Sequence, residues 1–220
     1  MTERTPSTWD EWVHFCFTEG DVDADHLYIG STDTDIAIYL TRLFENPAFI
    51  ADRYTDEQIA RGTWYIFGTA TWYMHGVIHG DVPPDLQIRC VRGITKMYTD
   101  LYDKVCGKRG RSPGGAKLRT KVDGAVYMMW DMDCLAGIHS IPHLIEPGIE
   151  IMESVLRQCR TTACRMSALH AIGHYVQEHH KPAPRIAGRF RALIDEFAQR
   201  PDVPDHLRKY AMEAREGQVQ

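Results

Sequence analysis

Four consecutive segments between Ile149 and Arg215 each carry apolar residues at helical spacing, and only short breaks separate them. Residues three or four apart share one face of an α-helix, so each segment can bury a single stripe. The stripes are Ile149, Met152, Val155, Leu156 and Cys159; Met166, Leu169, Ile172, Gly173 and Val176; Ile186, Phe190, Leu193, Ile194 and Phe197; and Leu207, Tyr210, Ala211 and Ala214. Equivalent positions recur after about 37 residues, which is within the range of helical-repeat units. The pattern predicts an α-solenoid of antiparallel helical hairpins, with residues 145–217 forming the clearest two repeats.

The rest of the chain also shows helical patterns, and strand-like alternation of useful length is missing from the sequence. Further helices are expected near residues 9–16, 33–44, 56–79, 85–105 and 122–135. The segment 56–79 is the most aromatic, and Thr55 is its expected N-cap because Gln58 follows three residues later. We therefore expect one all-α domain over residues 1–220.

Composition excludes several classes of protein. Hydrophobic residues make up 44% of the chain and charged residues 25%, as in ordinary globular proteins, so disorder is not expected. The net charge of −5, with basic and acidic residues interleaved, argues against a nucleic-acid partner. A basic glycine and lysine loop at residues 104–121 is the exception. We interpret it as a solvated connection, with an acidic or nucleic-acid contact as the alternative.

Cysteine usage and hydropathy predict a cytoplasmic protein without membrane contact. The six cysteines form no CxxC pair, and the first residues lack the basic and apolar regions of a signal peptide. The segment 62–80 is uncharged apart from histidines, but its glycines, threonines and histidines favour a buried helix over a membrane span. Cys159 and Cys164 are expected to pack in the repeat core, with a redox pair as the alternative.

Several stretches resemble an uncharacterised family of bacterial HEAT-like helical-repeat proteins. The stretches are FENPAFIADRYTDEQIARGTWY at 44–65, YMMWDM at 127–132, ACRMSALHAIGH at 163–174 and LRKYAMEAREGQVQ at 207–220. They contain the patterns YxDEQxxxGxWY and SALHxxGH. The resemblance implies an all-helical, intracellular bacterial protein, and it assigns no catalytic residues.

Two histidines on one predicted helix are the main candidates for chemistry. His170 and His174 are four residues apart, so their side chains lie one above the other and could share a metal ion, with Asp131 or Asp133 providing oxygen ligands. Two further histidine pairs repeat the spacing: His75 with His79 and His139 with His143. Because HExxH and HD motifs are missing, we interpret His170 and His174 as packing residues and predict no cofactor. A metal-dependent hydrolase is the alternative.

The aromatic residues in the middle of the chain favour a binding function. Tyr65, Trp72 and Trp130 have large apolar bodies with polar tips, which suits interface anchors, and Asp131 and Asp133 could add contacts to a basic protein. We expect a non-enzymatic module that binds a protein partner. By analogy with helical immunity proteins, the hypothesis is an antidote that binds and neutralises a bacterial toxin.

Overall fold

The computed structural model describes residues 7–20, 29–30, 32–68, 71–107, 120–132, 135, 137–178 and 184–219, and these residues form helices and connections without a strand. The α-helices are α1 Trp9–Thr18, α2 Asp33–Glu45, α3 Ile50–Arg53, α4 Asp56–Phe67, α5 Tyr73–His79, α6 Pro84–Lys96, α7 Asp103–Val105, α8 Lys121–Tyr127, α10 Pro142–Gln158, α11 Thr162–Glu178, α12 Pro184–Gln199 and α13 Asp205–Arg215. Short 3-10 segments are η1 Pro47–Phe49, η3 Met128–Trp130 and η4 Gly137–Ser140, and η2 Met97–Tyr102 is a π-helix. The predicted all-α class is confirmed.

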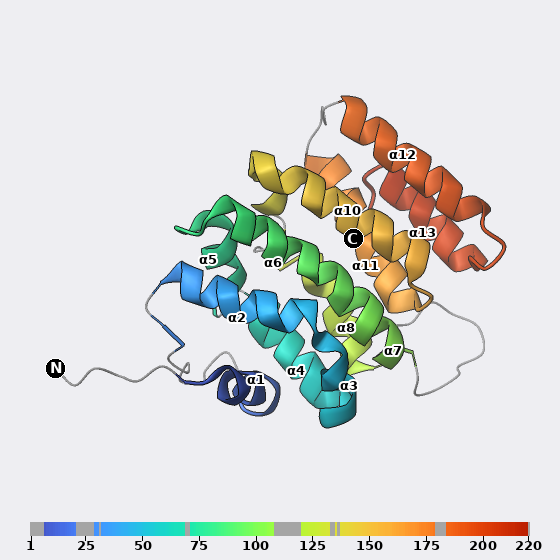
Figure 1. The fold of residues 1–220 in the computed structure, drawn as a ribbon. Coiled ribbons are helices and arrows are strands. Elements are labelled where there is room, and N and C mark those ends of the chain that lie inside the picture. The colour runs from blue at the N-terminus through green and yellow to red at the C-terminus, as the bar shows by residue number, and fades with distance from the viewer. Residues whose placement is uncertain are drawn as a thin grey trace.

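The helices pack in two rows (Figure 1). In one row α2 contacts α6, α6 contacts α10, and α10 contacts α12. In the other row α4 contacts α8, α8 contacts α11, and α11 contacts α13. Buried apolar side chains from both rows form one connected core, so α11 is held between α8 and α13 with α10 alongside.

Capping residues explain where several helices begin. Thr8 caps α1 and Thr32 caps α2. In each case the threonine hydroxyl accepts from the backbone N–H of the acidic residue three positions later, and the carboxylate of that residue accepts from the threonine backbone N–H. Thr55 caps α4 in the same way with Gln58, as the sequence predicted. These caps satisfy backbone N–H groups that a helix start would otherwise leave without partners.

The prediction of a single helix over residues 56–79 is wrong. Gly68 ends α4 in an extended conformation, and α5 begins only at Tyr73. Between them Trp72 has φ +57°, the one non-glycine residue with left-handed backbone in the described part of the chain. An L-residue in this conformation breaks a right-handed helix, because its Cβ approaches the following carbonyl oxygen.

Residues 84–105 form one continuous helix, as the apolar stripe predicted, but a segment in its second half is a π-helix, which is wider than an α-helix. The π-helix Met97–Tyr102 connects α6 to α7. It buries the rings of Tyr98 and Tyr102 completely. Insertions of this kind recur at functional sites, and Tyr98 is one residue that positions the candidate site described below.

The four segments of the C-terminal third are helical, as predicted, and correspond to α10, α11, α12 and α13. However, α10 begins earlier than expected and continues through Pro147. Proline removes one hydrogen bond from the helix and is tolerated best near its start. Of the histidine pair His139 and His143, the first lies in η4 and the second in α10.

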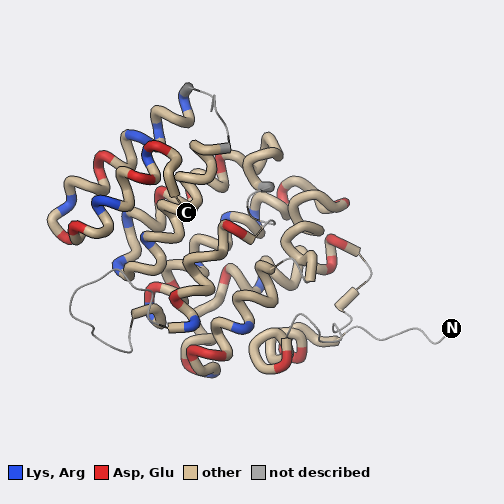
Figure 2. Tube along the Cα trace, turned by 180° about the vertical axis from the view of Figure 1, so that it is seen from behind, with Lys and Arg blue, Asp and Glu red and all other residues tan. Residues whose placement is uncertain are grey.

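Acidic and basic residues are interleaved over both rows of helices (Figure 2). In the described segments, every helix is too short or too polar to cross a bilayer. Residues 108–119 of the predicted basic loop lie outside the described residues, as does Asp133. At the end of that loop, Lys121 forms an exposed ion pair of 2.9 Å with Glu57.

Candidate functional site

Three side chains of types that can bind a metal ion converge between η3 and α11. Nε2 of His170 and Nε2 of His174 each lie 2.8 Å from Oδ1 of Asp131, and the two Nε2 atoms are 3.0 Å apart. We call Asp131, His170 and His174 the triad. The two histidines come from successive turns of α11, and Asp131 directly follows η3. The sequence named all three residues, whereas their convergence depends on the fold.

A network of buried hydrogen bonds fixes η3 against α11. Tyr98 of the π-helix accepts a hydrogen bond of 3.0 Å from Nε1 of Trp130 and is 2.8 Å from the hydroxyl of Ser167. Ser167 in turn donates to the carbonyl oxygen of Val126. Because Trp130 precedes Asp131 and Ser167 lies one turn before His170, this network sets the distance across the triad.

Two tyrosines hold the other side of the His170 ring. Nδ1 of His170 is 2.7 Å from the hydroxyl of Tyr210 on α13 and 3.2 Å from that of Tyr127 on α8, and the two hydroxyls are 3.0 Å apart. Burial, followed by the hydrogen bond with Tyr127, raises the pKa of Tyr210, so its hydroxyl keeps its proton. His170 therefore has partners on both ring nitrogens, as metal-ligating histidines usually do.

Burial differs across the triad. The side chain of His170 is 1% exposed, while those of Asp131 and His174 are 24% and 34% exposed. Burial lowers the pKa of His170, against the opposing effect of its hydrogen bond with Asp131. Its neutral form, the form that binds metal, is thus favoured. One side of the triad is fixed inside the protein and the other side faces solvent.

With Asp131 ionised, protons alone cannot satisfy every contact of the triad. An ionised Asp131 only accepts hydrogen bonds, so both Nε2 atoms must donate to it. The 3.0 Å contact between His170 and His174 then joins two donors. A cation resolves this conflict, since all three atoms can direct lone pairs at one ion.

The spacing also suits a particular coordination geometry. With metal bonds of about 2.1 Å, ligand atoms 2.8 to 3.0 Å apart subtend angles of about 90° at the ion. Such angles belong to three ligands on one face of a five- or six-coordinate ion. Positions on the opposite face of such an ion would be open for water or substrate.

A surface pocket of about 690 Å³ lies on the Tyr210 side of His170, and its lining includes none of the three triad residues. Its lining residues are Gln177, Tyr210, Glu213, Gly217, Gln218 and Val219. Gln177 lies three residues after His174 on α11, and Tyr210 contacts His170 directly. A polar molecule in this pocket would lie beside Tyr210, which contacts the Nδ1 side of His170.

The aromatic candidates for partner binding differ in exposure. Tyr65 and Trp130 are 3% and 4% exposed, because Tyr65 packs against Phe15 and Tyr73 and Trp130 against His139. Little of either ring can touch a partner. Trp72 is 58% exposed and lies against His75 at the start of α5.

Comparisons with known protein families, curated proteins and solved structures found no match to this chain. Tyr127 and Tyr210 were not singled out as site residues from the sequence. The available signal was weak: a tyrosine on a buried helical stripe needs a partner for its hydroxyl group, but the sequence does not name that partner.

Proposed function

We propose that this protein is a metal-dependent hydrolase whose ion is held by Asp131, His170 and His174. The observation that carries the proposal is the closed triangle of Asp131 Oδ1 and the two Nε2 atoms, with edges of 2.8, 2.8 and 3.0 Å. A divalent ion at such a site lowers the pKa of bound water and polarises a carbonyl or phosphoryl oxygen.

The surrounding residues have defined roles in this proposal. When Nε2 of His170 binds an ion, the ring proton must lie on Nδ1, which then donates to the oxygen of Tyr210. Tyr210 and Tyr127 thereby fix the ring in its binding orientation. In the reaction, the hydroxyl of water adds to the electrophilic atom of the substrate, and the leaving group takes up a proton.

The first test is metal content together with hydrolysis. By elemental analysis, the purified His174→Gln variant is expected to contain one equivalent of divalent metal less than the wild type. This substitution changes the exposed ligand. The matched control is His75→Gln, because His75 belongs to another histidine pair at the same spacing. The metal-loaded wild type should cleave members of a panel of chromogenic carboxyl and phosphate esters, and His174→Gln should not.

The identity of the metal is part of the same test. Two histidines and one carboxylate on one face of an ion are also the ligands of non-haem iron oxygenases. Zinc or manganese with ester cleavage supports hydrolysis. Iron(II) with consumption of dioxygen contradicts the hydrolase proposal. Equal metal content in His174→Gln and His75→Gln also contradicts it.

The second candidate function is binding of a protein partner, including the toxin-neutralising role suggested by immunity proteins. Trp72 favours it, because a large apolar side chain is 58% exposed at a residue held in left-handed backbone. Conformations of this kind are concentrated at functional sites. A partner that co-purifies with the wild type should be lost with Trp72→Ala and kept with Ile38→Ala, another exposed apolar residue.

The finer architecture is a proposal as well. The succession of contacts along each row is what a HEAT-like α-solenoid of helical hairpins would give. Membership of the HEAT-like bacterial family and a cytoplasmic location belong to the same proposal. The described cysteines are all free and buried, which suits a reducing compartment.

A further inference from the structure

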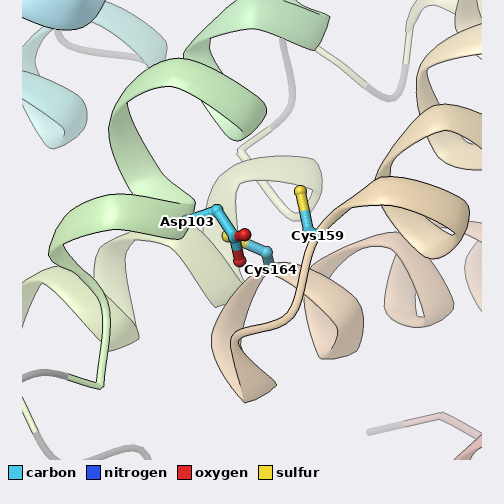
Figure 3. A group of neighbouring side chains, drawn as sticks. All are labelled: Asp103, Cys159 and Cys164. Carbon is cyan, nitrogen blue, oxygen red and sulfur yellow. The ribbon is translucent and has the colours of Figure 1, made fainter. Parts of the chain in front are cut away.

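A second group of metal-binding side chains lies where α7 meets the turn between α10 and α11 (Figure 3). One carboxylate oxygen of Asp103 and the sulfurs of Cys159 and Cys164 lie within 4.8 Å of one another. Both cysteines are buried, at 1% and 0% exposure. Cys106, just after α7, is also buried and interacts with Cys164, but its sulfur lies outside the group whose donor atoms are all within 4.8 Å of one another. Two sulfurs and one carboxylate are thus gathered from two parts of the chain, with a third sulfur nearby.

Asp103 is held in place beside the sulfurs. Its Oδ1 accepts hydrogen bonds of 2.8 and 2.7 Å from the backbone N–H groups of Arg160 and Thr161, at the turn that leads into α11. Cys159 and Cys164 flank this turn, and Figure 3 shows the Cys164 sulfur beside the Asp103 carboxylate. The carboxylate is therefore fixed next to the thiols by the backbone itself.

Apolar packing accounts for only part of this arrangement. A buried free thiol behaves as a small hydrophobe, but a carboxylate beside several thiols does not belong to an apolar cluster.

We propose that Cys159, Cys164 and Asp103 bind a structural zinc ion, and that Cys106, which interacts with Cys164, shifts toward them to supply the fourth ligand. Zinc takes four ligands of this type in tetrahedral geometry, with sulfur at about 2.3 Å and oxygen at about 2.0–2.2 Å. Each coordinating thiol loses its proton to solvent on binding, and no oxidation is involved. With these four ligands the ion would connect α7 to the α10–α11 turn and would have no open position for catalysis. The site is independent of the triad and of the proposed hydrolase function.

Cobalt substitution separates this site from the triad. We would express the full chain in medium in which cobalt(II) replaces zinc and record its absorption spectrum. Cobalt bound by cysteine gives a sulfur-to-metal charge-transfer band in the near ultraviolet, whereas the triad contains no sulfur. The band is expected in the wild type and in His174→Gln. The band should be lost in the double variant Cys159→Ser, Cys164→Ser. It should be kept in Cys90→Ser, because Cys90 is a buried cysteine that lies elsewhere, on α6.

A measurement on the wild type alone guards against a variant that fails to fold. The amount of zinc released should rise with the number of cysteines that a mercurial reagent has modified. One equivalent should be released at completion. A folded cobalt-grown wild type without the charge-transfer band overturns the proposal. An intact mass lower by two hydrogens also overturns it, because the pair would then be a disulfide.

Discussion

The two ring nitrogens of His170 link the triad to the tyrosines on α8 and α13. Nε2 contacts Asp131 and His174, and Nδ1 contacts the hydroxyls of Tyr210 and Tyr127. In a neutral imidazole ring one nitrogen carries the proton and the other carries a lone pair. The state of one nitrogen therefore decides whether the other donates or accepts. Metal binding at Nε2 therefore requires Tyr210 to accept a hydrogen bond.

Tyr210→Phe should weaken metal binding about 10- to 100-fold, because changes at residues that orient a metal-ligating histidine have effects of this size. The measurement is the metal Kd by competition with a chromogenic chelator. Tyr39→Phe is the control. Tyr39 lies on α2, and its hydroxyl donates to the backbone carbonyl oxygen of Ser7. Equal Kd values for wild type and Tyr210→Phe would argue against a role for Tyr210 in orienting His170.

Trp72→Asn should leave the protein as stable as the wild type or more stable by up to about 1 kcal/mol. Asparagine tolerates left-handed backbone better than tryptophan, and the Trp72 ring is more than half exposed. Trp64→Asn is the matched control, because Trp64 is 46% exposed within α4, where asparagine is a poorer helix former. Urea denaturation of both variants gives the comparison. A loss of more than about 2 kcal/mol at Trp72 would mean that its ring packs more tightly than its exposure indicates.

At the scale of elements, helix positions followed from periodicity and capping, whereas breaks depended on backbone geometry. Thr55 and Gln58 marked the start of α4 in the sequence, and the structure has that capping box. The end of α4 at Gly68 was not foreseen, because no rule of spacing predicts positive φ at a tryptophan. Local patterns fix local structure, and a left-handed residue is retained only by its tertiary surroundings.

Close contact between α2 and α6 depends on Gly93. A Cβ at this position would lie 2.8 Å from Cβ of Phe44, an atom attached directly to the α2 backbone. Gly93→Ala should therefore destabilise the protein by about 1–2 kcal/mol, since overpacking outweighs the gain of about 1 kcal/mol in helix propensity.

Gly188 on α12 provides the control, because a Cβ there meets no atom within 4 Å. Gly188→Ala should stabilise the protein by about 0.5–1 kcal/mol through helix propensity alone. Urea denaturation of both variants measures the difference. The same sign of effect at both glycines would show that α2 and α6 are not in close contact at Gly93.

At the scale of the whole molecule, the triad was only partly predictable. The spacing of His170 and His174 placed both on one helix face, and Asp131 was named as an oxygen ligand. Nothing in the sequence brings Asp131 to α11 across about 40 residues, because the sequence carries no motif of fixed spacing. The convergence arises from the network of Tyr98, Trp130 and Ser167, whose members lie on three separate elements.

Asp202 should make global stability depend on acid pH. Hydrogen bonds from Arg200 and then from Arg165 hold the pKa of Asp202 well below its usual value of 3.8, and Arg160 adds a third ion pair. A depressed carboxyl pKa stabilises the fold above the unfolded value, and that stabilisation is lost as pH falls from about 5 through 3.8 toward the lower folded value. In urea denaturation over this range, Asp202→Asn should show a shallower decline than the wild type.

Asp205→Asn is the control for this prediction, since the Asp205 side chain is fully exposed and its ion pair with Arg208 is 3.8 Å long. It should follow the wild-type pH profile. An unchanged profile for Asp202→Asn would mean that the surrounding arginines do not favour the ionised form of Asp202 in the folded state.

The most direct test of the metal-binding triad is the native mass of the 25.2 kDa chain, purified under non-denaturing conditions, beside that of His174→Gln. The triad predicts one more divalent ion on the wild type than on the variant, and His75→Gln should match the wild type. A wild type that carries no more metal than His174→Gln would contradict the triad as a metal site. In that case, a stoichiometric protein partner in the same spectrum would favour the binding function.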